Sequence, residues 1–409
     1  MSDMQKSSNT IYNALGRNPV HPFPARMAPE IVCSFIKRTE KPIRILDPMM
    51  GSGTVVALAQ SRNHHAIGID IDPLAILMGR VWTTPINRDS VKAKAGQVLK
   101  RASLLMPSTT TKLSFPTHAE PSTKKFIQYW FDSNSRRQLL CLSTSIARIK
   151  DTEIRDVLWC AFSRLIITKQ AGASRAMDLA HSRPHRRYKK GPLKPFDGFL
   201  PAIDSVLKNI IDSQSGDALP AASVRLGDAR KLGLPANSID LVLTSPPYLN
   251  AIDYIRCSKF SLVWMGHQID ALRTLRGESV GTEVGKKYEH DAEISKIMKS
   301  LRVSKLPNRK RLILAAYVYD MRLAIAEVAR VLDTGGQAIY VIGENTVKGN
   351  YIKTAKVLTQ LAEAVGLITL SSKRRSLPPN KRYMPPPTRG SMTMDTRMST
   401  EVILHFEKP

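Results

Sequence analysis

The sequence predicts an α/β protein with a Rossmann-like open sheet and a largely helical, basic insertion. Short apolar strands alternate with helices over residues 43–69, and the alternation resumes at residue 223. Between about residue 83 and residue 216, polar and basic residues with helical periodicity take over. We therefore interpret that stretch as an insertion or a second domain.

Length and charge suggest two structural units and a polyanionic partner. The chain has 409 residues, well above the roughly 150 of a typical domain, so it can bury a sizeable core. It carries 61 Lys and Arg against 34 Asp and Glu, a net charge of +27. Nucleic acid is the leading polyanion, because neutralising its phosphates releases counterions. The alternative is a soluble protein that is merely basic.

Neither a metal site nor a membrane segment is expected. The four cysteines have no metal-ligand or redox spacing, which fits a reducing cytoplasm. The first ten residues, MSDMQKSSNT, lack the apolar core of a signal peptide. No run approaches the roughly 20 apolar residues that span a bilayer.

The first half of the expected sheet surrounds a glycine-rich turn. Strands are predicted at residues 43–46 and 66–69, with a helix at 54–60 between them and a shorter helix near 31–36. Strand, glycine turn, helix and strand form the first half of a Rossmann-like unit.

The insertion combines amphipathic helices with a basic run. Helical periodicity is clearest at residues 135–149 and 152–168. The segment HSRPHRRYKKGPLKP, residues 181–195, is almost continuously basic. Such runs are usually solvated loops, but this one could also contact phosphates. The candidates for that contact are Arg183, Arg186, Arg187, Lys189 and Lys190.

The second half returns to strands and helices. A helix is predicted at residues 314–332, stopped by the glycine pair 335–336, and another at 354–365. Residues 265–311 should be rich in loops, and the proline-rich stretch 378–387 should be extended. Strands are predicted at residues 223–226, 239–243, 338–342, 367–370 and 402–406, the last of which should close the sheet.

The first motif that carries chemistry is the turn DPMMGSGT, residues 47–54. Its glycines let a cofactor approach the backbone closely, and open α/β sheets bind ligands at the carboxyl ends of their strands. Asp70 follows at the end of the next strand, where a carboxylate can accept from both hydroxyls of a ribose. The alternative is a glycine-rich turn without a ligand.

Two common nucleotide cofactors fit this turn poorly. A nucleoside triphosphate site needs a Lys after the last glycine, and no Lys follows Gly53. A dinucleotide site needs a third glycine where Val56 stands, so NAD is disfavoured but not excluded. Asp47 would repel a pyrophosphate, whereas it can pair with the cationic amino group of a methionine moiety.

The second motif is TSPPY, residues 244–248. Its two prolines remove two amide donors, so nearby carbonyl oxygens are free to accept hydrogen bonds. Ser245 adds a side-chain oxygen and Tyr248 a flat aromatic face. This combination suits a planar heterocycle that carries an amino group. The alternative is a proline-terminated strand with a structural tyrosine.

Together the motifs resemble those of the amino-methyltransferases of DNA, which modify cytosine N4 or adenine N6. The segments HPFPARMAPE, GIDIDP and GDAR fit the same family, over roughly residues 18–80 and 222–406. The Met49–Met50 pair departs from it, because an aromatic residue is usual there. The resemblance implies a class I methyltransferase fold, S-adenosylmethionine as cofactor and double-stranded DNA as partner. It also implies a prokaryotic or phage source, with a restriction endonuclease as a further candidate partner.

The resemblance assigns roles to single residues. The base would be flipped out of the duplex, and its amino group would donate to the Pro246 carbonyl and the Ser245 oxygen while Tyr248 stacks on the ring. Methyl transfer would be a direct in-line displacement without metal or covalent intermediate. The expected catalytic residues are Ser245, Pro246, Pro247 and Tyr248. The expected cofactor-binding residues are Phe23, Asp47, Pro48, Gly51, Ser52, Gly53, Thr54, Asp70 (with Asp72 as the alternative ribose acid) and Asp228.

By the same resemblance, residues 1–82 hold the N-terminal segment and the cofactor-binding half, residues 83–216 the insertion used for target recognition, and residues 217–409 the catalytic half. In that family a Ser at the start of the loop usually goes with cytosine, and Asp or Asn with adenine, so Ser245 indicates N4-methylcytosine. Methylation at carbon 5 of cytosine is not expected, because it would need a nucleophilic Cys, normally after a Pro, and none of the four cysteines follows a Pro. Adenine N6 methylation, an RNA base methyltransferase and a non-catalytic nucleic-acid-binding protein remain the alternatives.

Overall fold

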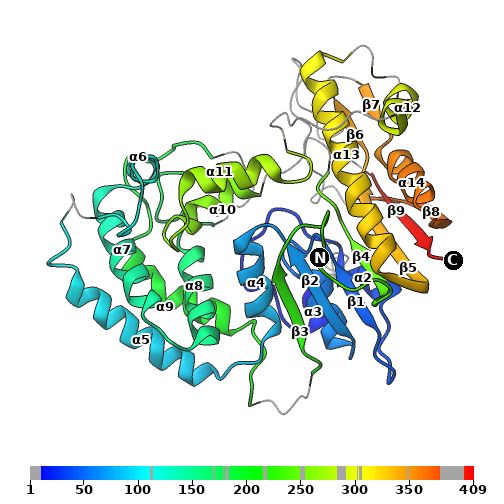
Figure 1. Cartoon of the computed structure of the whole chain (residues 1–409). Coiled ribbons are helices and arrows are strands. Elements are labelled where there is room, and N and C mark those ends of the chain that lie inside the picture. Colours follow the sequence, from blue (N-terminus) through cyan, green and yellow to red (C-terminus); the bar gives the residue numbers. More distant parts are fainter. Residues whose placement is uncertain are drawn as a thin grey trace, which may run out of the picture.

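The computed structural model describes residues 11–110, 114–168, 171–177, 179, 184–214, 219–248, 254–282, 292–301, 303, 306–347, 350–377 and 400–409. At its centre lies a seven-stranded sheet in the order β3-β2-β1-β4-β5-β9-β8 (Figure 1). Neighbours from β3 to β5 are parallel, and β9 is antiparallel to both of its neighbours. The predicted Rossmann-like sheet is confirmed. Its strands are β1 (Arg44–Asp47), β2 (His65–Asp70), β3 (Ala222–Leu226), β4 (Ile239–Thr244), β5 (Leu332–Gly343), β8 (Ile368–Ser376) and β9 (Thr400–Glu407).

Alternating side chains of the central strands feed two apolar cores. Ile45 of β1 packs into one core and Leu46 into the other, because successive side chains of a strand point to opposite faces. Leu241 and Val242 of β4 repeat the pattern. Since helices cover both faces, these strands are continuous apolar runs in the sequence. The covering helices are α3 (Thr54–Ser61) and α4 (Pro73–Thr83) on one face, and α13 (Asn308–Val331) and α14 (Thr354–Ala364) on the other.

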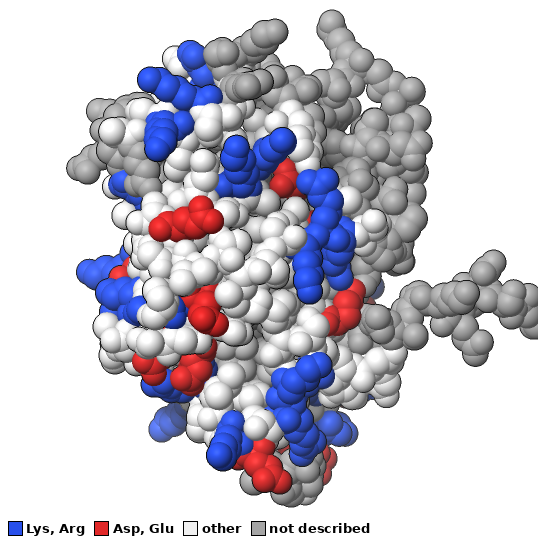
Figure 2. Space-filling model, turned by 90° about the vertical axis from the view of Figure 1, so that its right-hand side faces the viewer, with Lys and Arg blue, Asp and Glu red and all other residues white. Residues whose placement is uncertain are grey.

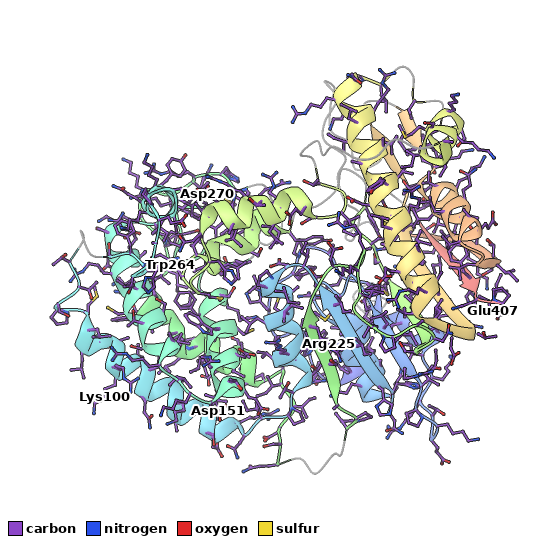
Figure 3. The ribbon with its side chains drawn as sticks, viewed as in Figure 1. Lys100, Asp151, Arg225, Trp264, Asp270 and Glu407 are labelled. Atoms are coloured by element: carbon purple, nitrogen blue, oxygen red, sulfur yellow. The ribbon has the colours of Figure 1, made fainter. Side chains whose placement is uncertain are left out.

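A helical unit packs beside the sheet, on the left of Figure 1. It shares a core with the sheet, because Trp82 at the end of α4 and Phe162 of α8 belong to one apolar cluster. Figure 3 shows Trp264 inside this unit and Lys100 on its outer edge. Its helices are α5 (Arg88–Leu105), α6 (Pro121–Trp130), α7 (Ser133–Ala147), α8 (Thr152–Arg164), α9 (Pro195–Leu207), α10 (Ile255–Leu262) and α11 (Ile269–Glu278).

Helices α10 and α11 follow the TSPPY segment, residues 244–248, in sequence but pack with the insertion. Phe260 of α10 lies 5.1 Å from Phe126 and 4.9 Å from Trp130, measured between ring centroids. The Gln268 side chain accepts hydrogen bonds from the Glu120 backbone at 3.0 Å and from the Thr123 hydroxyl at 2.9 Å. The chain therefore returns to the helical unit immediately after residues 244–248.

Smaller elements complete the described structure. They are α1 (Ile11–Leu15), α2 (Pro29–Phe35), α12 (Ala292–Ser300), β6 (Asn345–Val347) and β7 (Asn350–Ile352). On the face that carries α12, α13 and α14, basic and acidic side chains are interspersed (Figure 2).

Three sequence predictions need correction. Residues 265–311 are not mainly loop, because they contain α11, α12 and the start of α13. The glycines 335–336 do not stop α13, which ends at Val331 and passes directly into β5; Gly335 and Gly336 instead exchange backbone hydrogen bonds with Lys408. Strand β9 does not close the sheet at an edge, because it lies between β5 and β8. The stretch 378–387 lies outside the described residues.

Candidate active site

A cleft opens at the carboxyl ends of β1, β2 and β4. The order of the strands reverses between β1 and β4, which is where open α/β sheets bind ligands. The cleft encloses about 1510 Å³ including its mouth, and both sequence motifs line it. Of the predicted site residues, those that line it are Phe23, Asp47, Pro48, Gly51, Ser52, Thr54, Asp70, Asp72, Asp228, Ser245, Pro246, Pro247 and Tyr248.

The glycine turn follows β1 and needs its glycines. Gly51 has φ +53° and Gly53 has φ +82°, a backbone region that residues with a side chain rarely adopt. A Cβ at Gly51 would lie 3.2 Å from the Phe23 ring, and one at Gly53 would lie 3.3 Å from the Gly79 backbone. Gly53 thus serves the close packing of the turn on α4, while Gly51 lets Phe23 lie over the cleft.

The methionine pair of the turn divides its tasks. Met50 is 4% exposed, and its sulfur occupies the space beside Gly68 of β2 and Gly79 of α4, where an added Cβ would lie only 2.3 Å and 3.0 Å away. Met49 is less buried, and both methionines border the cleft. The departure from the aromatic residue usual in the resembling family is therefore accommodated by two glycines that make room for a buried Met.

Asp70 closes the turn from the end of β2. Its carboxylate accepts from the Gly51 backbone N–H at 2.7 Å and from the Asp72 N–H at 2.8 Å. The Ile71 backbone also contributes a hydrogen bond. Because an ionised carboxylate can accept about four hydrogen bonds, Asp70 can still accept from a ligand hydroxyl. Asp72 instead caps helix α4, accepting from the Leu74 N–H at 2.9 Å. Asp70 is the better placed of the two acids for a ribose.

Asp47 lies at the meeting point of the two motifs. Its side chain is 3% exposed and accepts a hydrogen bond from the Thr244 hydroxyl at 2.8 Å, which joins the end of β1 to the end of β4. Burial raises the pKa of Asp47 to about 7, although the bonds from Thr244 and the Met49 backbone oppose the shift. A cationic ligand group beside it would favour the charged form.

Asp228 lies on the far side of the cleft and is held by Arg230. The Arg230 guanidinium donates to Asp228 at 2.6 Å and to the buried Asp320 of α13 at 2.5 Å. Burial opposes the charge of Arg230, but the two carboxylates raise its pKa. By bridging Asp228 and Asp320, Arg230 therefore fixes the GDAR segment against α13.

The loop of residues 244–248 is held by hydrogen bonds from its own side chains. The Ser245 hydroxyl donates to the Val341 carbonyl of β5 at 3.0 Å. Its proton is thus committed to the protein, and its oxygen lone pairs stay available as acceptors. Pro246 and Pro247 have no amide hydrogens, so the loop presents acceptors to the cleft.

Tyr248 is anchored through a chain of charged groups that sequence reasoning missed. Its hydroxyl donates to Glu401 of β9 at 3.0 Å, and Glu401 accepts from Arg375 of β8 at 3.0 Å. Arg375 also donates to Glu30 of α2 at 3.0 Å. Burial and the charge of Glu401 raise the pKa of Tyr248 far above its usual range, so the phenol stays protonated. These partners come from distant segments, and no local motif marked them.

Tyr254 is a second cleft residue that the sequence did not reveal. Its ring stacks on Phe23 with the centroids 5.0 Å apart and the planes 8° from parallel. Both rings line the cleft. An aromatic residue six positions after Tyr248 was the only local signal.

The basic run lies on the helical unit, not in the cleft. Arg186, Arg187, Lys189 and Lys190 are exposed, and Arg183 lies outside the described residues. Among the described residues no group of three His, Cys, Asp or Glu side chains could hold a metal ion. No helix in the described ranges is long and apolar enough to cross a membrane.

An open sheet in this strand order, with a glycine turn after β1 and an acid at the end of β2, is the arrangement of the Rossmann-like class I methyltransferase fold. The chain is 23% identical to the Type II methyltransferase M.MvaI of Kocuria varians, over 94% of this chain and 89% of that protein. It is also 23% identical to the Type II methyltransferase M.BsoBI of Geobacillus stearothermophilus, over 79% and 72%. The chain is thus a relative of Type II methyltransferases, which agrees with the resemblance of its motifs.

Two further comparisons add little. No protein-family model matches the chain. A solved structure of an S-adenosylmethionine-dependent methyltransferase from Methanosarcina mazei aligns over 91% of this chain and 94% of that one, at 10% identity and a TM-score of 0.32.

Asp47→Asn should change the pH dependence of stability. Because burial raises the folded-state pKa of Asp47 from 3.8 to about 7, the folded protein binds this proton more tightly than the unfolded chain. That contribution is complete below about pH 4 and is lost as the pH rises to about 7, by up to about 4 kcal/mol. In urea unfolding experiments between about pH 4 and 8, the free energy of unfolding of Asp47→Asn should decline less with rising pH than that of the wild type. Parallel curves for the two proteins would contradict the assignment.

Proposed function

We propose that the protein is a DNA methyltransferase that transfers a methyl group from S-adenosylmethionine to the exocyclic amino group of a flipped base. The proposed target is N4 of cytosine. The observation that carries this proposal is the meeting of two motifs in one cleft. The Asp47–Thr244 hydrogen bond brings the glycine turn and the loop of residues 244–248 side by side. The Type II methyltransferases with which the chain aligns support the same class of reaction.

The cleft suits the three parts of the cofactor. Asp70 accepts hydrogen bonds from both ribose hydroxyls, and Asp228 borders the space for the adenine ring. Asp47 pairs with the amino group of the methionine moiety, and its raised pKa falls when that cation is present. When bound, S-adenosylmethionine would supply a methyl group activated by the sulfonium. The chain therefore needs only to bind the cofactor and orient the acceptor.

The loop supplies the acceptor geometry. The Ser245 oxygen and the Pro246 carbonyl accept from the two amino hydrogens of the base, which directs the nitrogen lone pair toward the methyl group. Tyr248 stacks on the ring, and Glu401 holds its hydroxyl. The rate gain comes from positioning, since in-line transfer requires aligned reactants.

The helical unit recognises DNA in this proposal. The exposed residues Arg186, Arg187, Lys189 and Lys190, together with Arg183, contact phosphates and set the position of the duplex. Base flipping brings the target to the cleft, because an amino group inside a stacked duplex is out of reach.

Asp70→Ala should weaken cofactor binding. The variant loses a charge-assisted pair with the ribose, which is worth about 1.5–3 kcal/mol, so the Kd for S-adenosylmethionine should rise roughly tenfold or more. Isothermal titration calorimetry measures it. Asp89→Ala on α5, far from the cleft, is the control and should leave the Kd unchanged. Equal affinity in Asp70→Ala would remove this residue from the site.

The product should be N4-methylcytosine. Plasmid DNA treated with the protein and labelled cofactor is digested to nucleosides and analysed by mass spectrometry, and methylome sequencing then locates the modified positions. N6-methyladenine as the sole product would overturn the cytosine assignment but keep the enzyme class. Transfer to RNA alone would favour an RNA base methyltransferase, and no transfer at all a non-catalytic binding protein.

Tyr248→Phe should lower turnover about three- to tenfold, the effect expected for one hydrogen bond, while cofactor affinity stays unchanged. Tyr248→Ala, which also loses the stacking face, should lower it further. In a Glu401→Ala background, Tyr248→Phe should have little additional effect, because the anchor is already gone. Single-turnover methylation measures the rates of the wild type, the three single variants and the double variant. Fully additive losses would mean that Glu401 does not act through Tyr248.

A further inference from the structure

A buried guanidinium near the start of helix α7 has one donor without a hydrogen-bond acceptor among the described residues. Arg136 is 6% exposed, and its Nε atom is buried without a partner. It lies over the Phe115 ring, 5.2 Å from the centroid. Among the described residues it makes no ion pair. Burying a cation without a partner is unfavourable unless an anion compensates it. The arrangement therefore calls for a ligand.

Two more arginines gather at the same end of α6. Arg175 donates to the Tyr129 carbonyl at 3.2 Å, while its Nε atom is buried without a partner. Arg186 lies over the Tyr129 ring at 5.4 Å. Burial lowers the pKa of Arg136 and of Arg175, and the neighbouring charges lower them further, Arg175 acting on Arg136 and Arg186 on Arg175. Three like charges thus lie within reach of one another.

Among the described residues, the acid whose charge acts on Arg136 and Arg175 is Asp132, a single negative charge whose oxygens already accept four hydrogen bonds. Asp132 caps α7, accepting from the Asn134 and Ser135 backbone at 3.0 Å each, from the Ser135 hydroxyl at 2.9 Å, and from the Gly191 N–H at 2.7 Å. Its carboxylate makes no hydrogen bond to the three arginines within the described ranges. The cluster consequently keeps an excess of positive charge.

We propose that Arg136, Arg175 and Arg186 form a fixed site for one phosphate group of a DNA backbone. Guanidinium groups match phosphate oxygens in charge and geometry and are weakly hydrated, so they suit a partly buried site. The ligand class rests on the proposed function, in which DNA is the substrate. The site lies at the end of α6, and α6 packs against α11 (Figure 1). Arg276 of α11 and Ser279, the residue that follows this helix, line the cleft. It fixes the duplex relative to the cleft and carries no sequence information.

Arg136→Met distinguishes a ligand site from a structural contact. Met is apolar and of similar reach, so the DNA-free variant no longer buries an uncompensated charge, and its Tm should rise by about 2 °C. Its affinity for DNA should fall at least fivefold. Differential scanning fluorimetry and fluorescence anisotropy with a labelled duplex measure the two quantities. A lower Tm together with unchanged affinity would overturn the proposal.

Arg175→Gln tests the site through salt dependence, because each lost phosphate contact lowers the slope of log Kd against log salt by roughly 0.9 between about 50 and 200 mM KCl. Lys100→Gln, a charge change on the outer edge of the unit, is the matched control and should keep the wild-type slope (Figure 3). Equal slopes in the two variants, with wild-type protein that methylates DNA, would overturn this site and leave the proposed function standing. Wild-type protein that neither binds nor methylates DNA would overturn both.

Discussion

The hydrogen bond between Thr244 and the buried Asp47 is the contact on which the site depends. It ties the tips of β1 and β4 at the point where the strand order reverses, so the glycine turn and the loop of residues 244–248 are held together. Because Asp47 is shielded from water, this bond is made in a low-dielectric setting, where it is stronger and its loss more costly. Burial also raises the pKa of this carboxyl to about 7, so a cation beside it would increase its charged fraction.

The rest of the cleft is built around that joint by segments distant in sequence. Glu30, Arg375 and Glu401 come from α2, β8 and β9 and converge on the hydroxyl of Tyr248. The antiparallel β9, placed between β5 and β8, is what brings Glu401 to the cleft. Aromatic stacking of Phe23 on Tyr254 joins the N-terminal segment to the chain after the loop. The catalytic loop is thus held from both sides.

The helical unit has a different physical character from the sheet. Its interior is apolar and continuous with the core on α4, yet Arg136 is buried at the α6–α7 corner with its Nε atom unpaired among the described residues. A neutral side chain of the same size would pack there without a desolvation penalty. An anionic ligand at this corner, as proposed above, would offset that penalty.

The sequence by itself determined the sheet and the composition of the site. Apolar runs placed β1, β2 and β4 within about a residue, and Asp70 and most residues of DPMMGSGT and TSPPY line the cleft, because strand ends and turns are encoded locally. Only the tertiary structure decided what is non-local: that β9 enters the sheet beside β5, that α10 and α11 join the insertion, and that Glu401 anchors Tyr248. Pairing between segments 58 to 153 residues apart depends on packing, and no local periodicity records it.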